Sequence, residues 1–243
     1  MADAGPDPER DGERIDDANA RIGPPPVRPG DDAAPPDHGV GPYPGGPSAW
    51  PDDDRLDPVL LRDGDRRNVV DRFRYWTHEA IVADLDERRH DFHVAIENWQ
   101  HDLNIGSVVR TANAFLAREV HIVGRRRWNR RGAMVTDRYQ HVRHHPKVED
   151  LVAWARVEGV AVIGIDNLPG SVPLETAALP RRCVLVFGQE SVGLSDAVRE
   201  AADATLAIAQ YGSTRSINAG AAAAIAMHAW VRQHADVDAG HRP

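Results

Sequence analysis

The stretch LVFGQESVGLS, residues 185–195, decides the fold class. An apolar run ends at Gly188, a turn with Glu190 and Gly193 follows, and Ser195 is placed to start a helix. This order is typical of a phosphate-binding loop, yet an acidic residue stands inside it. No Gly-x-Gly-x-x-Gly or Walker-type sequence occurs in the chain, so a dinucleotide or nucleoside triphosphate site is not supported.

Strand and helix patterns alternate on both sides of this stretch. Apolar and β-branched runs predict strands over residues 92–98, 119–124, 160–166, 182–188 and 204–210. Apolar residues at helical spacing predict helices over residues 67–76, 77–89, 104–117, 148–159 and 216–235. Thr77 is a plausible N-cap and Gly159 a helix end. The alternation predicts an α/β fold, with a mostly parallel sheet and helices on both faces.

Composition and charge restrict the class of protein. The chain has 243 residues, and no stretch approaches the length needed to span a membrane. Its N-terminus, MADAGPDPERDGERIDD, is acidic and has no apolar segment, so it does not resemble a signal peptide. The one cysteine, Cys183, lies in an apolar run and is expected to be a buried structural thiol. We expect a cytoplasmic protein.

The net charge of −8 is concentrated at the N-terminus. Residues 1–55 hold 13 Asp and Glu against 5 Arg, together with 12 of the 18 prolines, so the rest of the chain is neutral. This segment lacks apolar periodicity and is expected to be a disordered acidic, proline-rich tail. Residues 56–90 then form a short helical extension, residues 91–236 the main domain, and residues 237–243 a flexible C-terminus.

Two further strand ends carry polar side chains where open α/β sheets bind ligands. Asn104 is placed to cap the following helix, and Arg110 follows among apolar neighbours, where a guanidinium needs an anionic partner. Near the C-terminus, Ser216 and Asn218 enter a helix whose first turns consist of small residues. Small residues permit the close approach of a ligand and equally the tight packing of helices, so both interpretations stay open.

Three segments, taken in order, resemble the signature motifs of the SpoU/TrmH family of RNA ribose 2′-O-methyltransferases, of the SPOUT class. They are residues 98–115, residues 187–195 and residues 208–226. The resemblance covers about residues 68–235 and implies a parallel α/β sheet with a C-terminal trefoil knot. It also implies S-adenosyl-L-methionine as methyl donor and a homodimer with its active sites at the interface.

The resemblance assigns roles residue by residue. It implies that the donor is bound by Phe187, Gly188, Gly193, Ile208, Gln210 and Ile217. It implies that the catalytic group consists of Asn104, Arg110, Glu190, Ser216 and Asn218. The sequence departs from the family pattern at Ala209-Gln210, where Pro-Met is usual, and at Ile217, where Leu is usual.

A donor without phosphate explains the acidic turn, since no cradle of phosphate-binding amides is required. Glu190 is then expected to fix Arg110, Asn104 or the loop through charge-assisted hydrogen bonds, although a purely structural role in the turn remains open. The resemblance gives Arg110 as the proposed base. Because arginine is effectively always protonated, a clamp on the RNA phosphate and on the developing alkoxide is the more conservative role.

Residues 118–147 supply a positive surface for RNA. They carry nine Lys and Arg against two acidic residues, and Trp128 and Tyr139 offer faces for stacking on unpaired bases. The expected RNA-binding residues are Arg125, Arg126, Arg127, Trp128, Arg130, Arg131, Arg138 and Arg143. His141, His144 and His145 have no Cys or acidic ligand beside them in the sequence, so no metal is expected.

The leading hypothesis is an enzyme that methylates a ribose 2′-hydroxyl in structured RNA. The short extension favours tRNA over ribosomal RNA, and a large-subunit rRNA 2′-O-methyltransferase is an alternative. A catalytically inactive RNA-binding or assembly protein of the same fold, and a base methyltransferase, are the others. Ser-x-Asn at 216–218 favours the ribose.

Overall fold

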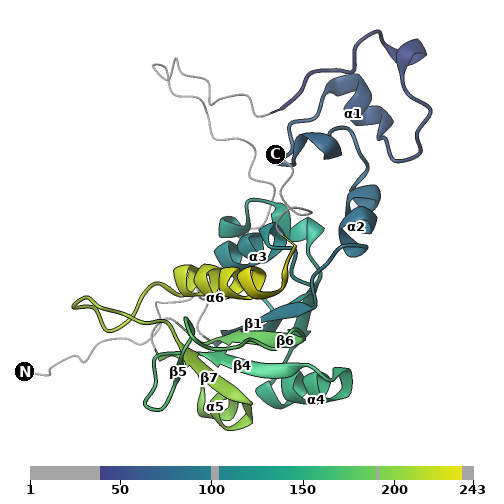
Figure 1. Ribbon diagram of the computed structural model, residues 1–243. Coiled ribbons are helices and arrows are strands. Elements are labelled where there is room, and N and C mark those ends of the chain that lie inside the picture. Colours follow the sequence, from purple (N-terminus) through teal and green to yellow (C-terminus); the bar gives the residue numbers. More distant parts are fainter. Residues whose placement is uncertain (1–38, 100–103, 190–191, 237–243) are drawn as a thin grey trace, which may run out of the picture. The chain divides into compact units, whose positions relative to one another are not determined.

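A seven-stranded, all-parallel sheet forms the centre of the chain (Figure 1). The computed structural model describes residues 39–99, 104–189 and 192–236. The strand order is β3-β2-β1-β6-β4-β7-β5. The strands are β1 (Phe92–Asn98), β2 (Val120–Gly124), β3 (Val142–His145), β4 (Ala161–Ile165), β5 (Val172–Pro173), β6 (Cys183–Phe187) and β7 (Ala204–Ala207). The predicted α/β fold with a parallel sheet is confirmed, while the trefoil knot stays a prediction.

Helices cover both faces of the sheet, as the alternating pattern predicted (Figure 1). The helices are α1 (Pro58–Asp63), α2 (His78–Asp86), α3 (Ile105–Ala114), α4 (Val148–Glu158), α5 (Asp196–Ala201) and α6 (Ala219–His234). On one face, Val94 and Ile96 pack with α3 and α6, and on the other, Ala95 packs with α4 and α5. Alternate residues of one strand therefore serve two separate cores.

Most local predictions agree with these elements. All five predicted strands and four of the five predicted helices are present, with ends that differ by a few residues. Thr77 and Ser195 accept N-cap hydrogen bonds from Ala80 and Val198, and Gly159 ends α4 in the left-handed region. Cys183 is buried, and this burial raises the pKa of its thiol to about 12. Within the described residues, no helix combines the length and the apolar character that crossing a bilayer requires.

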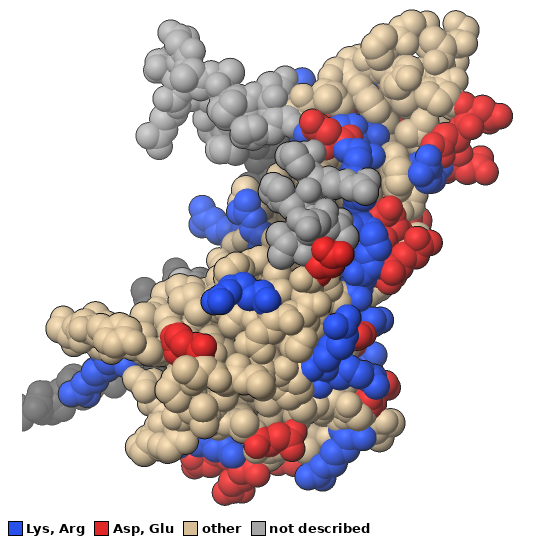
Figure 2. Space-filling model, in the orientation of Figure 1, with Lys and Arg blue, Asp and Glu red and all other residues tan. Residues whose placement is uncertain are grey.

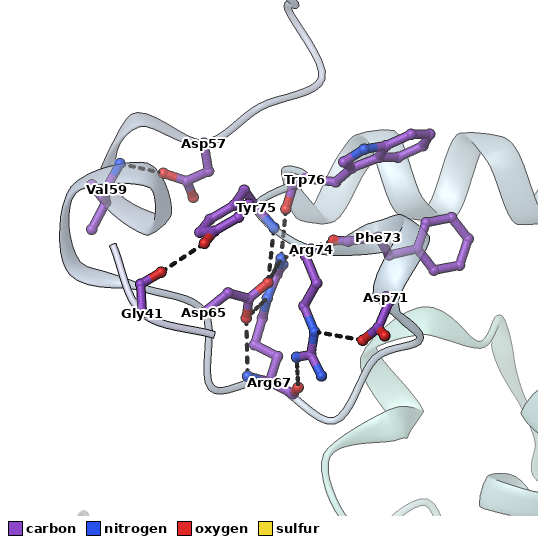
Figure 3. Close-up of polar contacts among 10 residues, drawn as sticks. All are labelled: Gly41, Asp57, Val59, Asp65, Arg67, Asp71, Phe73, Arg74, Tyr75 and Trp76. Atoms are coloured by element: carbon purple, nitrogen blue, oxygen red, sulfur yellow. Dashed lines mark hydrogen bonds and ion pairs between the residues drawn. The ribbon is translucent and has the colours of Figure 1, made fainter. Parts of the chain in front are cut away.

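The helix predicted over residues 67–76 is wrong. Only the 3-10 turn η2 (Asp71–Phe73) forms there, and Tyr75 has a φ of 63°. Two arginine side chains instead bond backbone carbonyls at opposite ends of this segment: Arg67 donates to Trp76 O at 2.8 Å, and Arg74 donates to Arg67 O at 2.7 Å (Figure 3). The carboxylate of Asp65 fixes Arg67 in turn.

The folded part of the chain begins before residue 55, which the composition had placed in the tail. Val40 and Asp65 form an antiparallel bridge, and the backbone N–H of Tyr43 donates to Leu61 O at 2.8 Å. The hydroxyl of Tyr75 donates to Gly41 O at 2.6 Å (Figure 3). Residues 39–55 are therefore held against the extension by hydrogen bonds that a composition argument cannot foresee. Residues 1–38 and 237–243, predicted as flexible ends, lie outside the described residues.

Candidate donor and RNA sites

A cavity of about 260 Å³ lies at the carboxyl ends of β4, β6 and β7, and we call it the strand-end cavity. Its walls come from the loops after β4, after β6 and after β7, and from the start of α6. The lining includes all six residues expected to bind the donor, namely Phe187, Gly188, Gly193, Ile208, Gln210 and Ile217, together with Ser216. The second and third motif segments, which are separate in the sequence, therefore line the same cavity.

The loop after β6 folds back on itself so closely that it requires glycine. Gln189 and Gly193 exchange backbone hydrogen bonds of 3.0 and 2.8 Å. A Cβ on Gly188 would lie 2.0 Å from the carbonyl carbon of Gly193, which has a φ of 70°. Both glycines are therefore needed for the shape of the cavity wall.

Three carboxylates hold the backbone of these loops. Asp166 Oδ2 accepts from the N–H of Leu194 at 2.9 Å, and Glu97 Oε2 accepts from the N–H of Ser195 at 2.8 Å. Glu175 Oε1 accepts from Ala209 N–H at 3.0 Å. The sequence alone did not predict a role for any of these three carboxylates. An acidic residue directly after the apolar run of β4 was a usable signal for Asp166, whereas nothing local points to the other two.

Asn104 and Asn218 join the first motif to the third. Asn218 Nδ2 donates to Asn104 Oδ1 at 2.9 Å, and Asn218 Oδ1 accepts from Ala221 N–H at the start of α6. The expected capping role of Asn104 is wrong: it occupies the N-cap position of α3 with helical backbone angles, and its side chain makes no capping bond. Its side chain instead faces the helix that begins beside the cavity.

Arg110 is not brought to the cavity of its own subunit. Arg110 is exposed on α3, is absent from the cavity lining, and has no hydrogen bond or ion pair with any described residue. Glu190 lies outside the described residues, so its predicted contact with Arg110 or Asn104 is not tested.

The strand-end cavity fits an adenosine-like ligand. Phe187, Ile208 and Ile217 give it apolar walls. Gln189 Oε1 and Gln210 Oε1 are buried and find no hydrogen-bond partner among the described residues, and both residues line the cavity. Because a buried acceptor without a partner costs free energy, these two amides suit a ligand that brings its own donors.

The predicted RNA-binding arginines are all exposed. They are Arg125, Arg126, Arg127, Arg130, Arg131, Arg138 and Arg143. Asn98 fixes the start of their loop, since its Nδ2 donates to the carbonyls of Arg125 and Arg127 at 2.8 Å each. Figure 2 shows Lys and Arg side chains along one side of the visible face, with acidic side chains beside them.

The two predicted stacking residues behave differently. Trp128 is half-buried against the core, with the guanidinium of Arg130 5.4 Å from its ring centroid. Tyr139 is only 6% exposed, because it packs with Phe73 and Ile81. The expectation that Tyr139 offers a free face to bases is therefore wrong.

The three histidines of this region do not form one cluster, because each has different partners. His141 Nε2 contacts Asp86 at 2.8 Å, and His144 Nε2 contacts Gly124 O at 2.7 Å. His145 instead joins a buried row with His121 and His93, and we call these three the histidine row. The ring nitrogens of His93 and His121 lie 3.1 Å apart, and those of His121 and His145 lie 2.9 Å apart.

Glu119 brings an acidic group close to this row. His93, Glu119 and His121 offer three ligand atoms within 4.8 Å of one another, a grouping that the sequence did not reveal. Their existing contacts account for them, since His121 uses both nitrogens in the row and Glu119 Oε1 accepts from Arg143 Nε at 3.0 Å. The absence of a metal stays a prediction.

Comparisons with known proteins agree with this geometry. The model of the SpoU rRNA Methylase family matches residues 91–228. The tRNA (guanosine(18)-2′-O)-methyltransferase of Escherichia coli K12 is 26% identical over 159 residues, which is 64% of this chain and 69% of that protein. An uncharacterized tRNA/rRNA methyltransferase of Mycobacterium sp. strain KMS is 33% identical over 58% of this chain and 46% of its own length.

Among solved structures, the SpoU methyltransferase AviRb of Streptomyces viridochromogenes is similar, with 26% identity and a TM-score of 0.55 over 62% of this chain and 63% of that one. The AdoMet-bound rRNA methyltransferase of Sinorhizobium meliloti has 27% identity and a TM-score of 0.55, over 62% of this chain and 59% of that one. The family model spans more than half of the chain, and the predicted recognition is confirmed. The chain belongs to the SpoU rRNA methylase family.

Proposed function

We propose that this chain is an enzyme that transfers a methyl group from S-adenosylmethionine to a ribose 2′-hydroxyl of structured RNA. Membership of a methylase family gives the enzyme class. The observation that carries the rest is the strand-end cavity, where the second and third motifs form one wall and the Asn104–Asn218 hydrogen bond lies beside it.

The donor residues hold the nucleoside part of the molecule. Phe187, Ile208 and Ile217, which line the cavity, would pack against the adenine, and the buried Gln210 Oε1 would accept a hydrogen bond from the donor molecule. Gly188 and Gly193 allow the backbone to approach closely. S-adenosylmethionine, when bound, supplies a methyl group already activated on a sulfonium. The protein must therefore position the hydroxyl and stabilise the charge that develops on its oxygen.

Arg110 is the residue that stabilises this charge. As a guanidinium it stays protonated, so it binds the phosphate beside the target ribose and the developing alkoxide. Ser216, which lines the cavity, and Asn218 orient the ribose. We expect Glu190 to fix Arg110, Asn104 or its own loop through charge-assisted hydrogen bonds.

The position of Arg110 favours a homodimer. In one subunit Arg110 is exposed and does not line the strand-end cavity, so a second subunit is needed to place it opposite the donor. Exposed apolar side chains at the cavity rim and on α6 support a subunit contact: Val192 is 59% exposed, Tyr211 97% and Ile225 42%. C-terminal threading of the knot is part of the same proposal.

We favour tRNA as the substrate over large-subunit ribosomal RNA. The similar E. coli protein is named for guanosine 18 of tRNA. The exposed arginines after β2 provide phosphate contacts, with Trp128 for stacking. A cytoplasmic location is part of this proposal.

The test is a methyl-transfer assay with purified protein, labelled S-adenosylmethionine, and tRNA or ribosomal RNA as acceptor. We expect label in tRNA and, after alkaline digestion, dinucleotides that resist cleavage, because a 2′-O-methyl group blocks the attacking hydroxyl. Label on a base would show a base methyltransferase. Failure to bind S-adenosylmethionine by calorimetry would favour an inactive RNA-binding protein. Mass-spectrometric mapping of 2′-O-methyl sites in cells with and without the gene then identifies the nucleotide.

A further inference from the structure

A second cavity, of about 440 Å³, lies where the extension meets the loop before β3. We call it the extension cavity. Its lining combines cationic, amide and apolar side chains, and includes no acidic residue: Arg66, Arg67, Asn68, Met134, Val135, Thr136, Arg138 and Tyr139. None of these residues lines the strand-end cavity.

Two neighbouring apolar residues at this cavity have an unusual backbone. Met134 and Val135 both have positive φ angles, of 48° and 67°, and they are 57% and 58% exposed. Left-handed angles are unfavourable for ordinary residues and especially so for a β-branched valine. Exposed apolar residues gain no burial in return, so folding alone does not explain this conformation. Strain of this kind is concentrated at ligand-binding sites.

The backbone on both sides of this pair is fixed. Ala133 is fully buried, and Thr136 Oγ1 donates to its carbonyl at 2.6 Å. Gly106 of α3 and Gly132 pack so closely that a Cβ on Gly106 would lie 2.8 Å from the N–H nitrogen of Gly132. Met134 and Val135 are therefore presented by a rigid support.

The cationic walls are also held in place. His78 Nε2 contacts the carbonyl of Arg138 at 2.7 Å. Asp65, fully buried, accepts from both the backbone and the guanidinium of Arg67 (Figure 3), so the segment that carries Arg66 is anchored. The side chains of Arg66 and Arg138 are exposed, and neither has an ion pair with a described residue. Two cations that no described carboxylate pairs with thus stand at the rim of an apolar surface.

We propose that the extension cavity is a subsite for an unpaired nucleotide of the substrate RNA, whose base packs on Met134 and Val135 and whose phosphates pair with Arg66 and Arg138. The inference rests on the proposed RNA substrate. An apolar platform flanked by arginines suits a base and its phosphates. The nucleotide must be unpaired, since a base inside a duplex does not expose its flat face.

The test uses fluorescence anisotropy of full-length protein with two labelled probes: bulk tRNA, and a blunt RNA duplex with the same number of phosphates. The key variant is Val135→Gly, which removes the side chain and suits the observed φ of 67°. We expect it to bind tRNA about tenfold more weakly, because the apolar surface of the valine side chain is no longer buried by the base, while its affinity for the duplex and its melting temperature do not fall. Val157→Ser, at an 85% exposed valine of α4, is the control and keeps full affinity.

A second variant separates base from phosphate contacts. Arg138→Ala is expected to lower the slope of log affinity against log salt by about one, whereas Val135→Gly leaves the slope unchanged. Unchanged binding of tRNA by Val135→Gly, an equal loss for tRNA and duplex, or dissociation of a dimer by this variant would each overturn the subsite. Wild-type protein that shows the expected RNA binding but transfers no methyl group would overturn the proposed function and leave the subsite standing.

Discussion

The strand-end cavity and the histidine row belong to the same sheet, but they differ in whether their buried polar atoms have hydrogen-bond partners. At the cavity, Gln189 Oε1 and Gln210 Oε1 are buried, and no residue that the structure describes bonds them. In the row, His121 is fully buried, yet both its ring nitrogens have partners in neighbouring histidines. A buried group without a partner indicates a place where a ligand completes the bonding, and a satisfied group indicates structure.

The type of a side chain alone therefore does not identify a functional site. Histidine clusters attract functional interpretation, but this row links β1, β2 and β3 beneath Trp154 as neutral, mutually bonded rings. The cavity contains few chemically reactive side chains, and its fit to a ligand depends on glycines and backbone held by carboxylates. Four experiments test the difference, in order of decreasing expected effect.

The largest effect is expected from Arg110→Ala. Methyl transfer should fall at least about a hundredfold, as on removal of one group that stabilises developing charge. Affinity for S-adenosylmethionine, measured by calorimetry, should not change, because the proposed contacts of Arg110 are with the RNA phosphate and the developing alkoxide and not with the donor. Arg156→Ala, at an exposed arginine of α4, is the matched control. An equal loss of donor affinity would refute the role of Arg110 in the transfer step.

A smaller but still large effect is expected from Gly188→Ala. Its Cβ would lie 2.0 Å from the carbonyl carbon of Gly193, so the wall of the cavity must shift. Forcing a methyl group into a packed site costs about 1–3 kcal/mol of stability, and a cost of this size borne by the donor-bound state corresponds to a loss of about five- to 150-fold in donor affinity. Gly41→Ala, where a Cβ meets nothing within 4 Å, serves as the control. Normal affinity in Gly188→Ala would place the donor elsewhere.

A weaker effect is expected from Asp166→Ala, which removes the acceptor of the Leu194 N–H. The loop after β6 then loses one hydrogen bond to a charged group, and donor affinity should fall about three- to tenfold. Asp166→Asn, which keeps an acceptor, should recover most of this loss. If both variants bind the donor like wild type, the loop does not depend on this carboxylate.

The histidine row should affect stability alone, and only in acid. Burial, with nearby arginines, lowers the pKa of His93 to about 4, and burial with the neighbouring histidines lowers that of His121 to about 2. Because the unfolded chain takes up protons below about pH 6.5 and the folded chain does not, stability should fall as the pH drops from about 6.5 to 4, by about 1.4 kcal/mol per pH unit for each histidine.

Denaturant unfolding across this pH range measures the effect. His93→Gln should give a shallower acid dependence, while His228→Gln, at an exposed histidine of α6, should leave it as in wild type. Stability of the wild type that stays constant down to pH 4 would contradict the assignment of neutral, buried rings.

Much of the fold could be predicted from the sequence because its signals are local. Apolar β-branched runs gave five strands, and the caps Thr77, Gly159 and Ser195 are set by their own turns. β3 was not predicted, since it lies at the sheet edge and most of its side chains are polar. The prediction of a helix over residues 67–76 was wrong because side-chain-to-backbone hydrogen bonds join the two ends of this segment, which no local pattern reveals.

The residues of the donor site could be predicted only where they belong to a family motif. The contacts that shape it join distant parts of the chain: Glu97 reaches Ser195, and Asn218 reaches Asn104. No local pattern contains such pairs. Tyr139 is likewise buried and not exposed as expected, because Phe73 of the extension packs over it.

The most direct test is a crystal structure of the protein with S-adenosylhomocysteine, the demethylated donor. Its adenosine should lie between the loops 188–193 and 208–217 of one subunit, near Gln210, with Arg110 of the second subunit facing the sulfur. Density for the ligand outside the strand-end cavity, or a monomer in which Arg110 is remote from the sulfur, would contradict the account.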